Sequence, residues 1–338
     1  MPDFRIGLCY DFRNPRDSGI PTPRLYAEVL EQIAWADRAG FDQVWFTEHH
    51  FVDDGYLPSW IPVAAAAAAR TSRVRFSTDI CLLPFNHPIR LAEDLAVLDN
   101  LSDGRVEIGL GIGYAPHEFR GFGIPASRRV SFADEGLEVL RRCFSGERFS
   151  FKGKRWTFDD VVITPRYVQP GGPPLWVAAM SAAGARRAAR FGCNLLPQGP
   201  RSETLDTWRA AVEADGRDPS AHRIGIIRGV LVTDEPERDW PAVRQSERYR
   251  MQLYQRFFEE SGEGLGPGGE RIPQTWIVGP VEKCVEEIVA FARGYGITDL
   301  VTWGAPPGIA PAKMNASLER LITEVVPKVR GQLVGGPR

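Results

Sequence analysis

The chain has 338 residues, of which 43% are hydrophobic and 25% are charged. These proportions exclude a collagen-like, coiled-coil or largely disordered chain. The 41 basic and 43 acidic residues give a formal net charge of -2, so there is no general electrostatic reason to expect nucleic acid or an anionic membrane surface as a partner. The composition therefore favours the chemistry of small molecules.

Cysteine usage and the absence of long apolar stretches indicate the compartment. The five cysteines include no CxxC spacing, and their odd number argues against a disulfide framework, so we expect reduced thiols in a cytoplasmic protein. The N-terminal residues lack the basic start and apolar centre of a signal peptide. The longest apolar stretch, residues 61–69, is far shorter than the ~20 residues of a membrane helix.

Short β-branched or aromatic runs alternate along the chain with segments of helical period, which is typical of strand–helix units around a parallel sheet. The predicted strands are residues 4–8, 43–46, 74–82, 106–110, 175–178, 194–196, 224–233 and 299–302. The predicted helices are residues 23–39, 62–70, 88–101, 132–144, 182–191, 202–214, 281–293 and 313–329. Eight strands, each followed by a helix, predict an α/β fold in which residues 1–338 form a single (β/α)8 TIM barrel.

The first predicted helix has residues typical of a helix start and a helix end. Thr22 is a suitable N-cap, Pro23 suits the first helical position, and Gly40 suits the left-handed residue after the helix. Asp37 is the one polar residue in its apolar stripe.

Two segments are additional to the eight predicted strand–helix units. Residues 149–158 predict a β-hairpin inserted before the fifth strand. The insertion after the seventh strand contains a predicted helix, 241–260, followed by a loop rich in glycine and proline, 261–278. This loop is either a mobile active-site loop or a surface insertion without a role.

Polar residues gather after the predicted strands, where TIM barrels build their active sites. Four of the five histidines lie on these loops: His49, His50, His87 and His117. Each could transfer protons or be a structural residue. Adjacent His49 and His50 would point to opposite sides of a strand, unlike the His-x-His of barrel metallohydrolases, so we expect no metal site.

Small residues follow the fourth and fifth strands. Residues 109–113 lack the last glycine of a dinucleotide-binding fingerprint, because position 114 is Tyr114. Their glycines permit either a flat ligand or a tight turn. In residues 180–184, free N–H groups at a helix start could bind phosphate, or Ser181 could simply cap the helix. Arg128 and Arg129 either add charge to such a site or lie in solvent.

Four segments together resemble the bacterial luciferase-like family of flavin-dependent monooxygenases. They are FDQVWFTEHHF (41–51), LLPFNHPIRLAEDLAVLDNLSDGRVEIGLGIGY (82–114), LWVAAMSAAGARRAARFG (175–192) and VGPVEKCVEEI (278–288). The resemblance implies a (β/α)8 barrel that takes reduced FMN from a separate reductase. It also implies that O2 adds at the flavin C4a position to give a (hydro)peroxyflavin, which oxygenates a small organic substrate.

The resemblance also assigns residues. It implies that His49 is catalytic together with Glu48, which would lie beside the flavin ring. The cofactor contacts that it implies are Glu48, Ile80, Gly111, Ile112, Arg128, Arg129, Ala179, Met180, Ser181, Ala182 and Gly184. Gly111 and Ile112 stand where luciferase has a reactive cysteine and a flavin-binding arginine, so light emission is not expected. The substrate-pocket residues that we expect, for an apolar substrate, are Tyr10, His50, Trp60, Phe85, His87 and Trp303.

Two other functions stay open at this point. A branch of the same superfamily transfers hydride with the deazaflavin F420 in a similar barrel, and some family members are flavin-binding subunits without activity. The intact Glu48-His49-His50 segment argues against the second. The alanine-rich helix at 64–69 and the helix after His87 occupy the positions of the family's dimer interface, so we expect a homodimer. Burial of the alanine-rich helix against its own barrel explains its small residues equally well.

Overall fold

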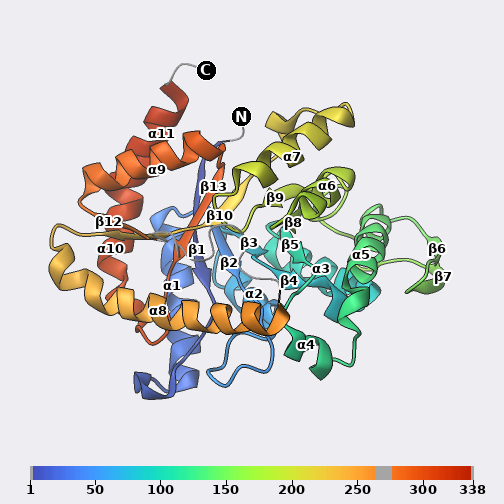
Figure 1. The fold of residues 1–338 in the computed structure, drawn as a ribbon, viewed down its shortest axis with the longest axis horizontal. Helices are drawn as coiled ribbons and strands as arrows, with labels where there is room; N and C mark the ends of the chain where they lie inside the picture. The colour runs from blue at the N-terminus through green and yellow to red at the C-terminus, as the bar shows by residue number, and fades with distance from the viewer. Residues whose placement is uncertain (1–2, 263–275, 336–338) are drawn as a thin grey trace.

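The computed structural model describes residues 3–262 and 276–335, and its centre is a curled parallel sheet (Figure 1). One sheet has the strand order β10-β13-β1-β2-β3 and another the order β4-β5-β8-β9, with every pairing parallel. Two further parallel contacts, between Phe76 and Val106 and between Leu195 and Ile224, join the edges of these sheets. The pairing therefore returns to its starting strand, as a (β/α)8 barrel requires.

The strands of the ring lie close to the predicted positions. They are β1 (Arg5–Tyr10), β2 (Gln43–Phe46), β3 (Arg75–Thr78), β4 (Cys81–Leu82), β5 (Ile108–Gly111), β8 (Leu175–Ala178), β9 (Asn194–Leu196), β10 (Gly225–Ile227) and β13 (Asp299–Trp303). The predicted strand 74–82 is split into β3 and β4. The predicted strand 224–233 continues beyond β10 as β11 (Gly229–Val232), which pairs with the unpredicted β12 (Trp276–Gly279).

Helices follow the strands around the outside of the sheet (Figure 1). They are α1 (Thr22–Ala39), α2 (Trp60–Ala68), α3 (Pro88–Ser102), α4 (Pro116–Gly121), α5 (Arg129–Phe144), α6 (Ala182–Arg190), α7 (Ser202–Ala214), α8 (Pro236–Ser261), α9 (Val281–Tyr295), α10 (Asn315–Arg320) and α11 (Val326–Gly335). A five-residue π-helical turn, Leu321–Val325, separates α10 from α11 within the single predicted helix 313–329. In the described ranges, no helix has both the length and the apolar character needed to cross a membrane.

Helix α1 ends at the predicted glycine but begins one residue earlier than predicted. Gly40 has φ 103° and ends the helix in the left-handed region, as predicted. The N-cap is Pro21 and not Thr22, which is already the first helical residue. The carboxylate of Asp37 accepts hydrogen bonds from the backbone N–H groups of Ser72, Arg73 and Val74 at 2.8–3.1 Å. The polar residue in the apolar stripe therefore anchors the loop that leads into β3.

The two insertions take regular structure. Strand β6 (Phe149–Lys152) pairs antiparallel with β7 (Thr157–Val161) as a hairpin beside α5. Helix α8 begins at Pro236, earlier than the predicted start at residue 241, and Pro241 lies inside it. Glu237 and Asp239 in its first turn favour this start, because acidic side chains stabilise helix N-termini. Of the predicted loop 261–278, residues 263–275 lie outside the described residues.

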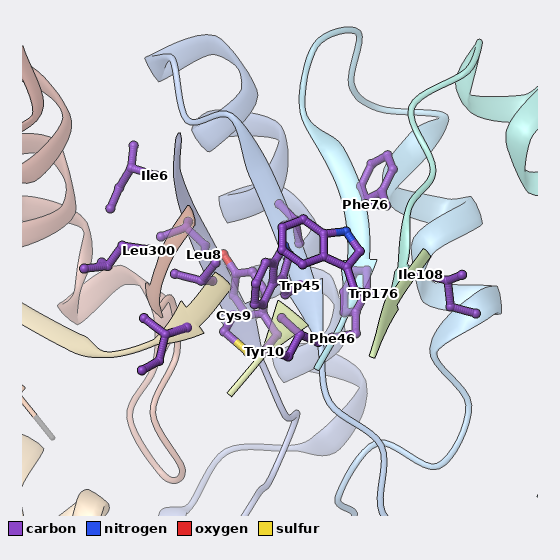
Figure 2. Packing of buried hydrophobic residues seen from close by; sticks show 14 of the residues in the cluster. Ile6, Leu8, Cys9, Tyr10, Trp45, Phe46, Phe76, Ile108, Trp176 and Leu300 are labelled. Atoms are coloured by element: carbon purple, nitrogen blue, oxygen red, sulfur yellow. The ribbon is translucent and has the colours of Figure 1, made fainter. Parts of the chain in front are cut away.

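The core is continuous across the ring, and Figure 2 shows Trp45 and Trp176 side by side within it. Their ring centroids are 5.8 Å apart in an edge-on arrangement. A Cβ at Gly225 would lie 2.4 Å from the ring of Trp45, so the two tryptophans fill the interior up to the backbone of β10. Close packing of this kind holds the strands at fixed positions.

A buried carboxylate organises the end of the ring where the strands begin. Glu107 accepts hydrogen bonds from Arg5 at 2.9 Å, Arg75 at 2.5 Å and the indole N–H of Trp176 at 2.7 Å. Although burial opposes ionisation, the charges of Arg75 and Arg5 hold the pKa of Glu107 below its ordinary value. The carboxylate therefore ties three strands together through charged contacts.

Replacing this carboxylate should destabilise the fold. We expect Glu107→Ala to lower the free energy of unfolding by about 3–5 kcal/mol, because the arginine charges lose a buried partner. The stabilising effect of the Glu107 carboxylate should be complete above the ordinary glutamate pKa of 4.5. It should disappear as the pH falls below the lowered pKa of Glu107 in the folded protein. Urea titrations at several pH values measure both effects. The control is Glu138→Ala, which removes an exposed pair with Arg142 and should cost about 1 kcal/mol or less.

Candidate functional site

Helix α8 crosses the end of the molecule opposite the chain termini (Figure 1). Its side chains and carbonyls bind the loops that follow four strands. The contacts are Ser246 with Pro307 after β13, Arg250 with Arg13 after β1, Tyr254 with Tyr56 after β2, and Phe257 with His117 after β5. The loops at the carboxyl ends of the strands therefore meet beneath this helix, where barrel enzymes place their active sites.

His49 lies in a buried aromatic environment at this rim. Its side chain belongs to the loop after β2, and the residue is 7% exposed. The ring centroid is 4.9 Å from Tyr56 and 5.1 Å from Phe257 of α8. Tyr114 and Tyr254 flank it at 5.8 and 5.9 Å. Water is largely excluded from this imidazole.

Glu118 of α4 binds His49 and was missed by the sequence analysis. Its Oε1 lies 2.8 Å from Nδ1 of His49 and accepts a 2.8 Å hydrogen bond from the backbone N–H of His50. Although burial opposes ionisation, these two contacts hold the pKa of Glu118 below its ordinary value. Glu118 is fully buried, and its Oε2 has no hydrogen-bond partner among the described residues. No sequence signal identified it, because α4 was not predicted and the partners are 69 residues apart.

His50 faces a different environment from His49, as alternation of adjacent side chains predicts. Its Nε2 is 3.0 Å from Oε1 of Glu48, and its ring packs edge-on against Phe85 and Phe122. Its carbonyl oxygen is 3.1 Å from Nε2 of His117. Glu48 and Phe85 are thus brought together with the two histidines, as the sequence analysis expected of a common site.

His87 lies elsewhere. It is exposed, and its ring packs against Trp156 and Phe158 of the hairpin region at 4.8 and 5.5 Å. None of its described ring contacts joins it to the His49 environment. This position gives His87 a packing role against the hairpin.

The residues expected to hold a flavin ring lie at the ends of neighbouring strands. A Cβ built on Gly111, at the end of β5, would lie 1.7 Å from Cδ1 of Ile80, which precedes β4. Ile112 is the next residue and is half-buried. Strand β8, which pairs with β5, leads directly into Ala179 and Met180. The expected ring contacts therefore surround one side of the rim.

The start of α6 has an accessible backbone. Ser181 is its N-cap, and its Oγ accepts a 3.4 Å hydrogen bond from the N–H of Gly184. The capping interpretation of Ser181 is thus confirmed, and it is compatible with a ligand at the same helix start. Ser181 and Met180 are exposed, Ala182 is half-buried, and a Cβ on Gly184 would lie 3.1 Å from Ala179. The small residues leave the first N–H groups of α6 open to an anionic group.

The two arginines expected near the phosphate lie at the start of α5. Arg128 is exposed beside the first residue of α5, and Arg129 is half-buried at that residue. Asp134 of α5 binds Arg187 and Arg190 of α6 at 2.5 and 3.0 Å, so the two helices are joined by ion pairs. The structure thus places the predicted arginines on the helix next to α6.

The aromatic residues expected in the substrate pocket lie in different environments. Phe85 stacks on Phe122 at 4.6 Å beside His50. Tyr10 is buried, and its hydroxyl donates to Gln32 of α1 at 2.9 Å, so it points to the surrounding helix layer. Trp60 is buried at the start of α2. Trp303 is covered by the guanidinium of Arg250, 4.2 Å from its ring.

A charged network beneath α8 was not predicted. Arg13 binds Asp54 at 2.7 Å, and Arg250 binds Glu247 at 2.6 Å, with all four side chains buried. Asp11 lies among them, and burial raises the pKa of Asp11 to about 6 against the opposing charge of Arg13. These residues were overlooked because arginine and aspartate in a loop usually lie in solvent.

The site contains titratable groups in a dry environment, which suits proton transfer. Among residues 3–262 and 276–335, no group of three or more histidine, cysteine, aspartate or glutamate side chains is arranged to bind a metal ion. All five cysteines are buried and free.

Comparisons with known proteins agree on a family. The family model described as luciferase-like monooxygenase matches residues 4–299. The oxygenase component of a flavin-dependent trigonelline monooxygenase from Acinetobacter baylyi is 26% identical, over 90% of both chains. A crystal structure of the monooxygenase RslO1 from Streptomyces bottropensis superposes with a TM-score of 0.84 and 26% identity, covering 96% of this chain and 99% of that one.

Two uncharacterized proteins of Sinorhizobium fredii are 30% and 31% identical over 61% and 65% of this chain. The matched region spans 60% and 66% of their own lengths. The family model covers most of this chain, including the strands that carry the candidate site, and the chain belongs to the luciferase-like monooxygenase family.

Proposed function

We propose that this protein is the oxygenase of a two-component system, using reduced FMN and O2 to oxygenate a small organic substrate. The observation that carries the proposal is the buried His49–Glu118 pair beneath α8, at a rim that also contains the residues expected to hold a flavin. The flavin-dependent oxygenase component of Acinetobacter baylyi supports it as a relative. By the same analogy, a separate reductase would supply the reduced flavin.

The residues present fit FMN. The side chain of Ile80 occupies the space over Gly111, where a Cβ would lie 1.7 Å from its Cδ1, and would offer the flavin ring an apolar surface. The open N–H groups at the start of α6, with Arg128 or Arg129 nearby, suit the phosphate. Glu48, held by His50, would lie at the ring. Bound reduced FMN would supply the two electrons that O2 needs for one oxygen atom to enter the substrate and the other to leave as water.

The chain's own residues would control protons and water. Glu118 would fix the ring of His49 through Nδ1, so that Nε2 would be the nitrogen left for proton transfer. Because Glu118 holds the imidazole of His49 in place at a buried position, we propose that this ring donates or accepts a proton without bulk water. The tyrosine and phenylalanine rings around it, together with α8, exclude solvent.

Assembly and location follow the same proposal. We propose a homodimer formed through α2 and α3, because Val97 and Leu101 of α3 are large apolar residues with 47% and 57% exposure. Five buried free thiols suit the reducing cytoplasm that we propose as its location.

A cofactor titration tests the proposal against hydride transfer with F420. We expect reduced FMN to bind in the micromolar range or tighter and F420 to bind at least tenfold more weakly, because the proposed site at the start of α6 suits a terminal phosphate monoester such as that of FMN, whereas the phosphate of F420 is a diester. Anaerobic fluorescence titrations of the purified protein measure both affinities. Tighter binding of F420 would support the hydride-transfer alternative instead.

Removing the imidazole should separate flavin binding from oxygenation. We expect His49→Ala to keep most of its affinity for reduced FMN but to release hydrogen peroxide in place of product, because proton control is lost. The ratio of product to O2 consumed is measured on a panel of aromatic, ketone and aldehyde compounds with a general flavin reductase. The control is His222→Ala, a half-buried histidine near the start of β10, at the other end of the ring. Unchanged coupling in His49→Ala refutes the role.

Glu118 should act on turnover through His49. We expect Glu118→Gln to lower kcat about ten- to a hundredfold, the effect of losing a hydrogen bond to a charged group, with little change in flavin affinity. Steady-state kinetics on the same panel measure kcat and KM. Glu135→Gln is the control, because Glu135 binds the backbone of the hairpin and lies outside the site. An equal loss in both variants would contradict a positioning role for Glu118.

A further inference from the structure

Among the described residues, the charged network around α8 contains three carboxyl groups, of Asp11, Asp54 and Glu247, and two guanidinium groups, of Arg13 and Arg250. Arg13 donates from Nε to Asp54 at 2.7 Å, and Arg250 donates to both oxygens of Glu247 at 2.6–2.9 Å. Each guanidinium thus has its own carboxylate partner. Asp11 is the third acid in the group.

The oxygens of Asp54 are fully used. Oδ2 also accepts from the hydroxyl of Tyr249 at 2.9 Å, and Oδ1 accepts from the backbone N–H of Tyr56 at 3.2 Å. Asp11 differs. Its Oδ1 accepts the backbone N–H of Arg13 at 3.0 Å, whereas Oδ2 has no hydrogen-bond partner in the described part of the chain.

The unpartnered oxygen lies in a protected position, since Asp11 is 0% exposed. Leaving a buried acceptor without a donor costs free energy in the ligand-free protein, so its presence calls for an explanation. A donor brought by a ligand would remove this cost.

Asp11 is at the same rim as His49. The carbonyl of Asp11 accepts the N–H of Leu57 at 2.9 Å, and the carbonyl of Leu57 accepts the N–H of His49 at 3.2 Å. The charge of Asp11 also contributes to the raised pKa of Tyr56, after burial and Tyr254. Tyr56 is the ring that packs edge-on against His49. A molecule held at Asp11 would therefore be next to the imidazole.

Aromatic side chains surround this position. The hydroxyls of Tyr56 and Tyr254 are 2.8 Å apart, and both rings flank His49. Trp303 and Tyr254 both face the guanidinium of Arg250. Aromatic molecules pack well against such planar groups.

We propose that Asp11 is a substrate-binding residue whose Oδ2 accepts a hydrogen bond from the hydroxyl group of an aromatic substrate. This inference rests on the proposed oxygenase function and replaces the purely apolar substrate with a hydroxylated aromatic one. The extra carboxylate disfavours an anionic substrate, because both arginines are already neutralised. Asp11 thereby selects the substrate by its donor group.

The test compares 2-naphthol with 2-methoxynaphthalene, which lacks the hydroxyl proton. Binding to the full chain is measured by tryptophan fluorescence and calorimetry, with and without FMN. We expect wild type to bind 2-naphthol about 10–100-fold more tightly, as for a hydrogen bond to a charged group, and Asp11→Asn to reduce this ratio at least tenfold.

The matched control is Asp299→Asn. Asp299 is also a buried carboxyl whose pKa burial raises to about 6, but it lies at the start of β13, at the opposite end of the ring. We expect the preference of Asp299→Asn for 2-naphthol over 2-methoxynaphthalene to equal that of wild type.

A wild-type ratio below about threefold, no binding of either compound, or an unchanged ratio in Asp11→Asn overturns the proposal, and the wild-type ratio needs no variant to fold. If FMN fails to bind while the preference for 2-naphthol persists, the result contradicts the proposed oxygenase function but supports the binding site at Asp11.

Discussion

Parallel pairing around a closed ring is the constraint on which the rest of the molecule depends. Because each strand runs in the same direction, the loops that follow β1, β2, β5 and β8 all emerge at one end. Helix α8 then needs only to cross that end to contact loops far apart in the sequence. The interior tryptophans keep the strands apart at a fixed spacing, so the loops start from defined positions.

The buried carboxyls of the ring differ in their partners. Asp299, where β13 begins, has a pKa raised to about 6 and one oxygen without a hydrogen-bond partner among the described residues. Glu107, where the strands begin, has three donors and a lowered pKa, so it stabilises the fold. Asp11, where β1 ends, is left with an unpartnered oxygen and a raised pKa. Unlike Asp299, Asp11 lies at the end of the ring that also contains His49, where in our proposal a ligand supplies the compensating contact.

Sequence patterns predicted most of the fold because strands and helices have their own periods. They located the ring strands within a few residues and placed Glu48, His49 and His50 on one loop. They missed Glu118 and Asp11, whose importance comes from partners that are distant along the chain. Tyr10 was expected at the pocket as an aromatic residue near the rim. A strand end offers two directions, and composition does not distinguish them, so the contact of Tyr10 with Gln32 was not foreseen.

The contact between Ile80 and Gly111 has an evolutionary consequence. Since a methyl group at position 111 would collide with the end of the Ile80 side chain, the two positions share one fixed volume. Homologues that carry a bulkier amino acid at the equivalent of Gly111 should have a smaller one at the equivalent of Ile80. These two positions should therefore covary, and an engineer who wishes to reshape this wall must change both together.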